Sequence, residues 1–317
     1  MKSIKILLSS AACMLFFALS ANAQDINQAI ELNNKGAEAA KAQDWATAIT
    51  QFNQALVILE QLGEEGASMS QEIKDLIPSL HYFLGQELAK ATKIDEAIAE
   101  LKKAIEVAQK YDDPSSTAVD AKKLIDQLNL SAANNLLNDK KYDEAIAAYK
   151  GILVVEPNNG ALYYYIGVAY QGLTNDGEAI TAYQKAIELG NKDAGARLAN
   201  IYLTQAQNAM REQKWQNMYD LSQKAAEVTP DNANVIKFVG ISAFQLKKYD
   251  EAVPALEKTL AANPNAADKN TTIYRLAQSL EAQNKNSQAC GYYKQLLTDA
   301  NFKETAEHKI KNVLKCQ

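Results

Sequence analysis

The apolar residues of this chain are spaced as in amphipathic α-helices. Between about residues 28 and 300, a small residue is repeatedly followed by apolar residues one, four and eight positions later, as at Ala97, Ile98, Leu101 and Ile105. This spacing places apolar side chains on one face of a helix. No segment of useful length alternates apolar and polar residues with period two, so no strands are predicted. The pattern therefore predicts an all-α fold.

The helical pattern is also an internal repeat. The segment 140–145 recurs letter for letter at 247–252, and another small residue lies twelve positions before the start of each stripe. Glycine in the middle of a helix costs about 1 kcal/mol relative to alanine, so we expect these residues to mark close crossings at which two antiparallel helices each contribute a small side chain. The structural repeat positions are Gly36, Ala48, Gly85, Ala97, Ala133, Ala145, Gly167, Ala179, Gly240, Ala252, Ala277 and Ala289.

Residues that start and stop helices follow the same repeat. Asp143 and Asp250 stand just before apolar stripes and are expected to cap the amino ends of helices. Pro157, Pro230 and Pro264 each lie twelve residues after the start of a stripe and are expected to end helices. The sequence therefore predicts short helices separated by tight turns.

Together these positions resemble the tetratricopeptide repeat, a helix–turn–helix unit of 34 residues with small residues at positions 8 and 20, an aromatic residue or leucine at 24 and proline at 32. The copy at 160–191 matches best. The first two intervals between repeats exceed the period, and their extra residues, at 63–79 and 111–124, are expected to form longer helices or extra turns. The resemblance implies a TPR-like right-handed superhelical solenoid of about seven units plus a C-terminal capping helix at 302–315. An unrelated helical bundle is the alternative. The expected apolar stripe of the capping helix is Phe302, Ala306, Ile310 and Val313.

The first residues have the pattern of an export signal. Residues 1–23 combine two early lysines with a largely apolar run and end in Ala-Asn-Ala, as in a cleaved secretory signal peptide. The alternative is an uncleaved anchor, but the apolar run is short for a bilayer of about 30 Å. We therefore expect an exported protein, periplasmic or secreted, whose single repeat domain at 24–317 has possible sub-blocks at 24–111 and 117–317.

Cleavage would leave two cysteines, Cys290 and Cys316. In the oxidising compartments that exported proteins meet, an even pair commonly forms a disulfide, which we expect here. The alternative is a buried thiol at Cys290 and a free thiol in a frayed C-terminus. In two regular antiparallel helices with a rise of 1.5 Å per residue, the positions of these residues along the helix axes would differ by about 9 Å. The bridge therefore requires a stagger between the helices or an unwound chain end.

Composition and charge argue against several classes of function. Lys and Arg number 33 against 38 Asp and Glu, a net charge of −5, so no basic excess is available for binding nucleic acid. Two His and three Cys are too few for a zinc cluster, and the motifs of phosphate loops, serine hydrolases and dithiol redox proteins are missing. His81 is expected to be a packing residue and His308 a solvated one. We expect no cofactor, no metal site, no catalytic residues and no membrane segment after cleavage.

The family resemblance also implies a binding surface. In tetratricopeptide repeats the first helix of each unit lines the concave face, mainly at positions 2, 5, 9 and 12. Amides can pair with an extended peptide backbone, and tyrosines supply contact area at small entropic cost. No unit combines lysine at position 5 with asparagine at position 9, so capture of a C-terminal carboxylate is not expected. The groove candidates are Asn33, Tyr82, Gln86, Asn134, Tyr164, Gln171, Asn200, Gln207, Lys237, Tyr274 and Gln278.

These observations predict a non-catalytic exported scaffold or adaptor that binds a protein segment or peptide in the groove. Binding of a glycan or small ligand in the same groove is an alternative, because aromatic rings and amides also suit sugars. A third interpretation is an outer-membrane assembly factor similar to the helical-repeat lipoprotein of the barrel-assembly machinery, although Cys13 lacks the surroundings of a lipobox.

Overall fold

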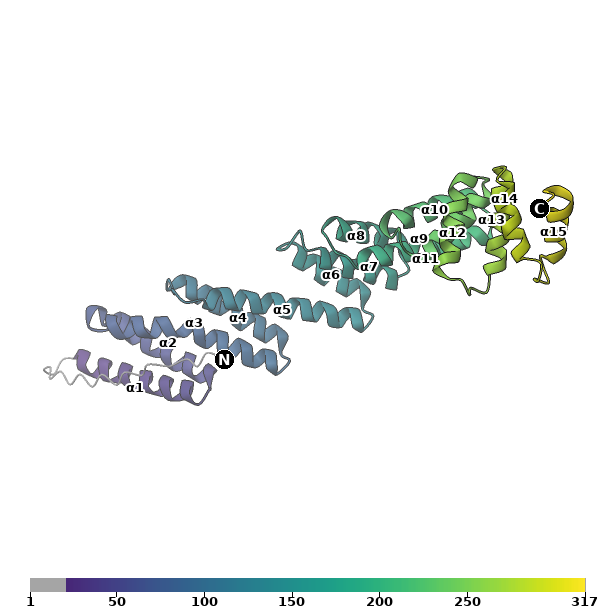
Figure 1. Ribbon diagram of the computed structural model, residues 1–317. Helices are drawn as coiled ribbons and strands as arrows, with labels where there is room; N and C mark the ends of the chain where they lie inside the picture. The colour runs from purple at the N-terminus through teal and green to yellow at the C-terminus, as the bar shows by residue number, and fades with distance from the viewer. Residues whose placement is uncertain (1–20, 317) are drawn as a thin grey trace. The chain divides into compact units, whose positions relative to one another are not determined.

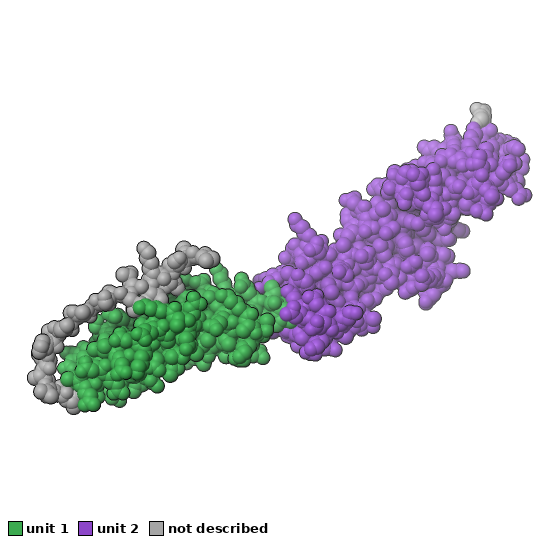
Figure 2. Space-filling model, turned by 90° about the horizontal axis from the view of Figure 1, so that it is seen from below, with its two compact units in different colours: residues 1–132 green, residues 133–317 purple. Residues whose placement is uncertain are grey.

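The computed structural model describes residues 21–316, with side chains from Ala23 onward. These residues form helices joined by short turns, and none of them lies in a strand, which confirms the all-α prediction. The chain divides into two compact units, residues 1–132 and 133–317 (Figure 2). The signal peptide predicted at 1–23 lies outside the described residues apart from its last three. No helix within the described range is long and apolar enough to cross a bilayer.

The first unit contains two complete helix pairs and the start of a third. In each complete pair the second helix lies against the first (Figure 1). The residues in excess of the repeat period lengthen α3 and α5 to 24 and 22 residues, as predicted from the sequence. The elements are α1 (Ala21–Lys41), α2 (Trp45–Gln61), η1 (Gly63–Glu65), α3 (Ala67–Lys90), α4 (Ile94–Lys110) and α5 (Thr117–Asn138), which continues into the second unit.

The second unit continues the same order, and from α6 to α14 each helix contacts the next one along the chain. Across residues 21–316, seven helix pairs, α1/α2 to α13/α14, precede a short final helix, which confirms the predicted number of repeats. The elements are α6 (Tyr142–Leu153), α7 (Gly160–Gly172), α8 (Asp176–Glu188), α9 (Ala194–Arg211), α10 (Trp215–Val228), α11 (Ala233–Gln245), α12 (Tyr249–Ala262), α13 (Lys269–Ala282), α14 (Asn286–Gln295), α15 (Lys303–His308) and η2 (Lys309–Val313).

The small residues at the structural repeat positions are all buried, but at Gly36 and Gly167 the nearest contact differs from the predicted one. A Cβ atom added to Gly36 would lie 2.9 Å from the Phe52 ring, and one added to Gly167 would lie 2.6 Å from the Tyr183 ring. The nearest partner at both sites is the aromatic residue sixteen positions later; at Gly85 an added Cβ atom would also lie 3.3 Å from the carbonyl oxygen of Ala97, the small residue twelve positions later. The small residue therefore makes room mainly for the large side chain, and at Gly36 and Gly167 the space left by glycine is filled by an aromatic ring.

Every turn within a helix pair contains one non-glycine residue in the left-handed backbone region. Because these turns are short, the following helices begin early, and Lys141 and Lys248 are the N-caps. The prediction that Asp143 and Asp250 cap these helices is therefore wrong; both lie in the first turn, where a negative charge still interacts favourably with the helix dipole. The left-handed residues are Gln43 (φ 61°), Thr92 (61°), Lys140 (61°), Thr174 (56°), Gln213 (58°), Lys247 (60°) and Asn284 (59°).

The end of the chain departs from a regular capping helix. After α15 the residues of η2 form a π-helical turn, and the Leu314 N–H donates to the Lys309 carbonyl. The wider turn shifts the apolar stripe by one position. Leu314 therefore packs against the core, whereas Val313, which was predicted to do so, is 46% exposed. The other predicted stripe residues lie in this core: Phe302, Ala306 and Ile310.

The same irregular end brings two cysteines together. Cys290 on α14 is joined to Cys316 with their Cα atoms 5.8 Å apart. The Cys316 N–H donates to the Ile310 carbonyl, and Lys315 has a φ of 49°, so the chain leaves the helical path just before the cysteine. This unwound end removes the mismatch that two regular helices would leave.

Candidate functional site

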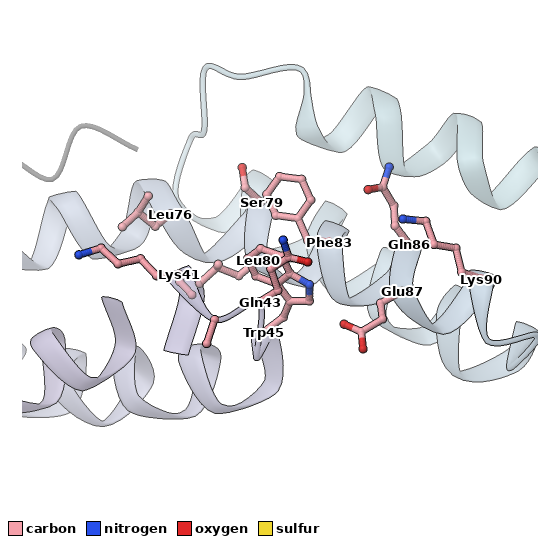
Figure 3. A pocket seen from close by; sticks show the side chains of 12 residues that line it. Lys41, Gln43, Trp45, Leu76, Ser79, Leu80, Phe83, Gln86, Glu87 and Lys90 are labelled. Carbon is pink, nitrogen blue, oxygen red and sulfur yellow. The ribbon is translucent and has the colours of Figure 1, made fainter. Parts of the chain in front are cut away.

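A hollow of about 800 Å³ lies in the first unit, between the α1–α2 turn and α3. Figure 3 shows Trp45 and Phe83 in its middle, with Lys41 and Lys90 on either side. The centroids of the two rings are 5.0 Å apart. We name this feature the Trp45 hollow; it is lined by Ala40, Lys41, Ala42, Gln43, Trp45, Leu76, Ser79, Leu80, Phe83, Gln86, Glu87 and Lys90.

The turn before α2 fixes the position of Trp45. Gln43 takes the left-handed conformation, and Asp44 then caps α2 by accepting the Thr47 N–H at 3.1 Å. The hydrogen bonds from Thr47 hold the pKa of the Asp44 carboxyl below its ordinary value. Trp45 is the first residue of α2, so this cap holds the indole beside α3 and Phe83.

The Trp45 hollow offers two kinds of contact. Its apolar part consists of the two rings and Leu76, which is 39% exposed although it is a large aliphatic residue. Its polar part includes amide groups and the ammonium groups of Lys41 and Lys90, both of which are exposed. Such a site can take an apolar side chain and at the same time pair with carboxylates or backbone amides.

Of the groove candidates in the first unit, Gln86 lines the Trp45 hollow. Its Nε2 donates to the Tyr82 hydroxyl at 2.9 Å, and Tyr82 is partly buried against the core that α4 and α5 share. Asn33 is half-buried on α1 and is not one of the lining residues. Sequence reasoning did not identify Trp45, because it examined the first helix of each unit and Trp45 opens a second helix.

In the second unit, two groove candidates bind tyrosines of their own repeat. The Tyr149 hydroxyl donates to Asn134 Oδ1 at 2.7 Å, and the Tyr183 hydroxyl donates to Gln171 Oε1 at 2.6 Å. Burial, together with the neighbouring Tyr165, raises the pKa of Tyr149 to about 12. The side-chain oxygens of Asn134 and Gln171 therefore satisfy buried hydroxyls, which fixes the two helices of each pair together.

Tyr164, Lys237 and Tyr274 are likewise held by neighbours. The Tyr164 ring lies 5.9 Å from Tyr183, and its hydrogen bond with Arg197 raises the pKa of that guanidinium. The Tyr274 ring stacks on Phe302 at 4.8 Å, and its hydroxyl accepts Gln278 Nε2 at 3.1 Å. These side chains are half-buried and preorganised, so their exposed edges are available to a partner at little entropic cost.

Lys237 forms an ion pair that spans two repeats. Its Nζ lies 2.6 Å from Asp268 Oδ2, and this hydrogen bond lowers the pKa of the Asp268 carboxyl. The last two groove candidates, Asn200 and Gln207, are exposed on α9. The candidates thus fall into residues that mainly join helices and residues that face solvent.

The histidines behave as two different types of residue. His81 is 8% exposed, and its Nδ1 lies 2.7 Å from Glu100 Oε2; sequence reasoning placed it in a packing position but did not find its carboxylate partner. His308 is exposed. Over the described residues, no cluster of His, Cys, Asp and Glu side chains could hold a metal ion.

Comparisons with known proteins give related sequences over part of the chain. The chain is 28% identical to Anaphase-promoting complex subunit 6 of Arabidopsis thaliana over 123 residues, and this aligned region is 38% of the chain. The chain spans about a fifth of the length of that curated relative, 22%.

The chain is also partly similar to solved structures. YrrB, described as a TPR protein with an unusual peptide-binding site, is 17% identical and covers 62% of this chain and 97% of its own, with a TM-score of 0.37. MamA of AMB-1 is 18% identical and covers 54% of this chain and 90% of its own, with a TM-score of 0.37.

Family models for the tetratricopeptide repeat match three segments of the chain, residues 78–111, 130–194 and 271–300. These segments lie in both units and coincide with the helix pairs α3/α4, α5 to α8 and α13/α14. The chain is thus a protein with tetratricopeptide repeats in these three segments.

Proposed function

We propose that this protein is a non-catalytic exported scaffold that holds a segment of another protein against the first helices of its repeats. The observation that carries the proposal is the Trp45 hollow, which combines an aromatic pair with the exposed lysines Lys41 at the end of α1 and Lys90 at the end of α3. Stacked repeats expose long continuous surfaces, which members of this family use for binding other proteins.

The chemistry of the Trp45 hollow favours an extended segment with an apolar or aromatic anchor residue. The indole of Trp45 and the ring of Phe83, whose centroids lie 5.0 Å apart, present a joint apolar surface against which that anchor can pack, as aromatic residues do in binding hot spots. Lys41 and Lys90 can pair with acidic residues on either side of it, while the amide of Gln86 can bond the peptide backbone.

Export is supported by the pattern of residues 1–23 and by the joined cysteines, since disulfides persist mainly in oxidising compartments. A chain that meets its partner in the periplasm or outside the cell would fit both observations. Fusion of residues 1–23 to a reporter that is active only outside the cytoplasm tests export separately from binding.

The chain supplies a matched control for the binding test. Trp45 and Trp215 are both half-buried and both begin the second helix of a pair, so Trp→Ala removes the same side chain from the same register. The mature chain, residues 24–317, is used to capture partners from an envelope extract. We expect Trp45→Ala to lose partners that wild type and Trp215→Ala retain; an unchanged set of partners with Trp45→Ala would contradict the proposal.

A glycan is the second candidate ligand, because amides of Gln43 and Gln86 flank the indole of Trp45 and aromatic faces with amides suit sugar rings. A glycan array probed with the mature chain and with Trp45→Ala separates the two functions. Signals that require Trp45 on the array, with no protein captured, would favour the glycan.

A further inference from the structure

A second hollow, of about 440 Å³, lies in the second unit between α6, α7 and α8. Its floor is Tyr163, Ile166 and Tyr170 of α7, and its walls include Leu153 of α6 and Ala182 of α8. We name it the α7 groove. The remaining lining residues, all exposed, are Lys150, Glu178, Thr181 and Lys185.

The α7 groove has a counterpart two repeats later. A hollow of about 220 Å³ between α10, α11 and α12, here named the α11 groove, uses the same register. Eight lining residues of the α7 groove, all except Tyr170, have counterparts 73 positions later that line the α11 groove. The two grooves therefore occupy the same register of the repeat, and most of their lining positions correspond.

Three differences distinguish the α7 groove. Tyr163 is replaced by Ile236 in the α11 groove, and Tyr170 corresponds to Ala243, which does not line it. The α7 groove is thus aromatic and has about twice the volume. Gln223 takes the place of Lys150, so the α7 groove also carries one more positive charge.

The lysines are placed on opposite walls of an apolar floor. Lys150 Nζ lies 3.2 Å from the Tyr170 hydroxyl and 5.7 Å from the centre of its ring, so its ammonium group is held at the rim. Lys185 extends from α8 and pairs with Glu188, which is not a lining residue. With Glu178 as the single acid, the lining is net positive on a chain whose net charge is −5.

We propose that the α7 groove binds an amphipathic helix of a partner protein that carries acidic side chains beside its apolar face. Two parallel walls with a floor between them accept a helix whose ridge of side chains fills the gap. Tyr163 and Tyr170 are seven residues apart, about 10.5 Å or two helical turns, which matches anchors at i, i+3 or i+4, and i+7. Carboxylates beside the anchors pair with the lysines on both walls.

The test uses a fluorescein-labelled helical peptide with leucines at i, i+3, i+4 and i+7 and glutamates beside them. Its dissociation constant for the mature chain is measured by fluorescence anisotropy at low salt. The double variant Lys150→Glu/Lys185→Glu changes only exposed residues; its fold is checked by circular dichroism. We expect it to weaken binding by about tenfold or more, since it places like charges opposite the peptide.

The matched control is Gln223→Glu/Lys258→Glu in the α11 groove, which we expect to leave the peptide's affinity unchanged. A second peptide with lysines in place of the glutamates should bind the wild type more weakly and the charge-reversed variant more tightly. Absence of binding by both peptides, equal losses in the two grooves, or binding to anionic vesicles in place of the peptide would overturn the proposal. Trp45→Ala should leave this affinity unchanged, so failure here is distinct from failure of the Trp45 hollow.

Discussion

Gly66, the N-cap of α3, provides the sharpest test of how closely the helices pack. A Cβ atom on Gly66 would lie within van der Waals overlap of the Leu59 carbonyl oxygen and 3.0 Å from the Leu59 Cα. Leu59 is 1% exposed in the middle of the core of the first unit, so the clash is with buried backbone and no rotamer change relieves it. Gly66→Ala should therefore destabilise the first unit by about 3 kcal/mol, the upper end of the usual cost of overpacking.

Gly151 is the matched control for this substitution. It lies inside α6, and an added Cβ atom would meet nothing within 4 Å. Gly151→Ala should therefore stabilise the chain by about 1 kcal/mol through helix propensity alone. The same change of residue is thus predicted to have opposite signs at two sites.

The assay uses the two tryptophans of the chain. In a Trp215→Phe background the fluorescence of Trp45 reports the first unit alone, and urea unfolding gives its midpoint. Gly66→Ala should lower that midpoint by about 1 M, at roughly 3 kcal/mol per M; Gly151→Ala, which lies in the second unit, is followed in a Trp45→Phe background. An unchanged or raised midpoint for Gly66→Ala would refute the packing argument.

Three further predictions concern turns, acid and the chain end. Thr174→Asn should raise the free energy of unfolding by about 0.5–1 kcal/mol, because a β-branched residue is strained at φ 56°. Asn284→Thr should lower it by a similar amount. Urea midpoints that move in the same direction in both variants would contradict this reasoning. Burial tends to raise the pKa of Glu100, but hydrogen bonds from Lys103 and His81 outweigh burial and lower it below the ordinary value of 4.5. The contribution of Glu100 to the stability of the first unit should be complete above about pH 4.5 and be lost as the pH falls through the lowered pKa. Glu100→Gln, followed by Trp45 fluorescence, should therefore weaken the loss of stability in acid. Cys316→Ser should lower the free energy of unfolding by about 3–4 kcal/mol, because it opens a loop whose ends are 26 residues apart. Amide hydrogen exchange should become faster at 303–314 and stay unchanged in α7.

The sequence was sufficient to predict the helix pairs, because small residues at a fixed spacing leave few other ways to bury the apolar stripes. Where prediction failed, the missing information was three-dimensional. Gly66 belongs to no repeat position, and its contact with Leu59 depends on the angle at which α2 meets α3. Val313 was assigned to the core because a π-helical turn cannot be read from apolar spacing.

The candidate site was harder to predict for a related reason. The resemblance directed attention to first helices, whereas the Trp45 hollow depends on a residue that opens a second helix. One relation could have been found in the sequence: a buried tyrosine needs an acceptor for its hydroxyl. Tyr149, Tyr183 and Tyr293 find it at Asn134, Gln171 and Glu281 on the first helix of their own pairs.

The seven left-handed turns give each helix pair a joint whose geometry is independent of its neighbours. A pair can therefore be duplicated, lost or replaced during evolution with its own turn intact, while its contacts with the pairs on either side, such as that of Gly66 with Leu59, must readjust. Such modular growth explains how one chain can retain the letters Lys-Lys-Tyr-Asp-Glu-Ala at two distant places while the side chains around them diverge.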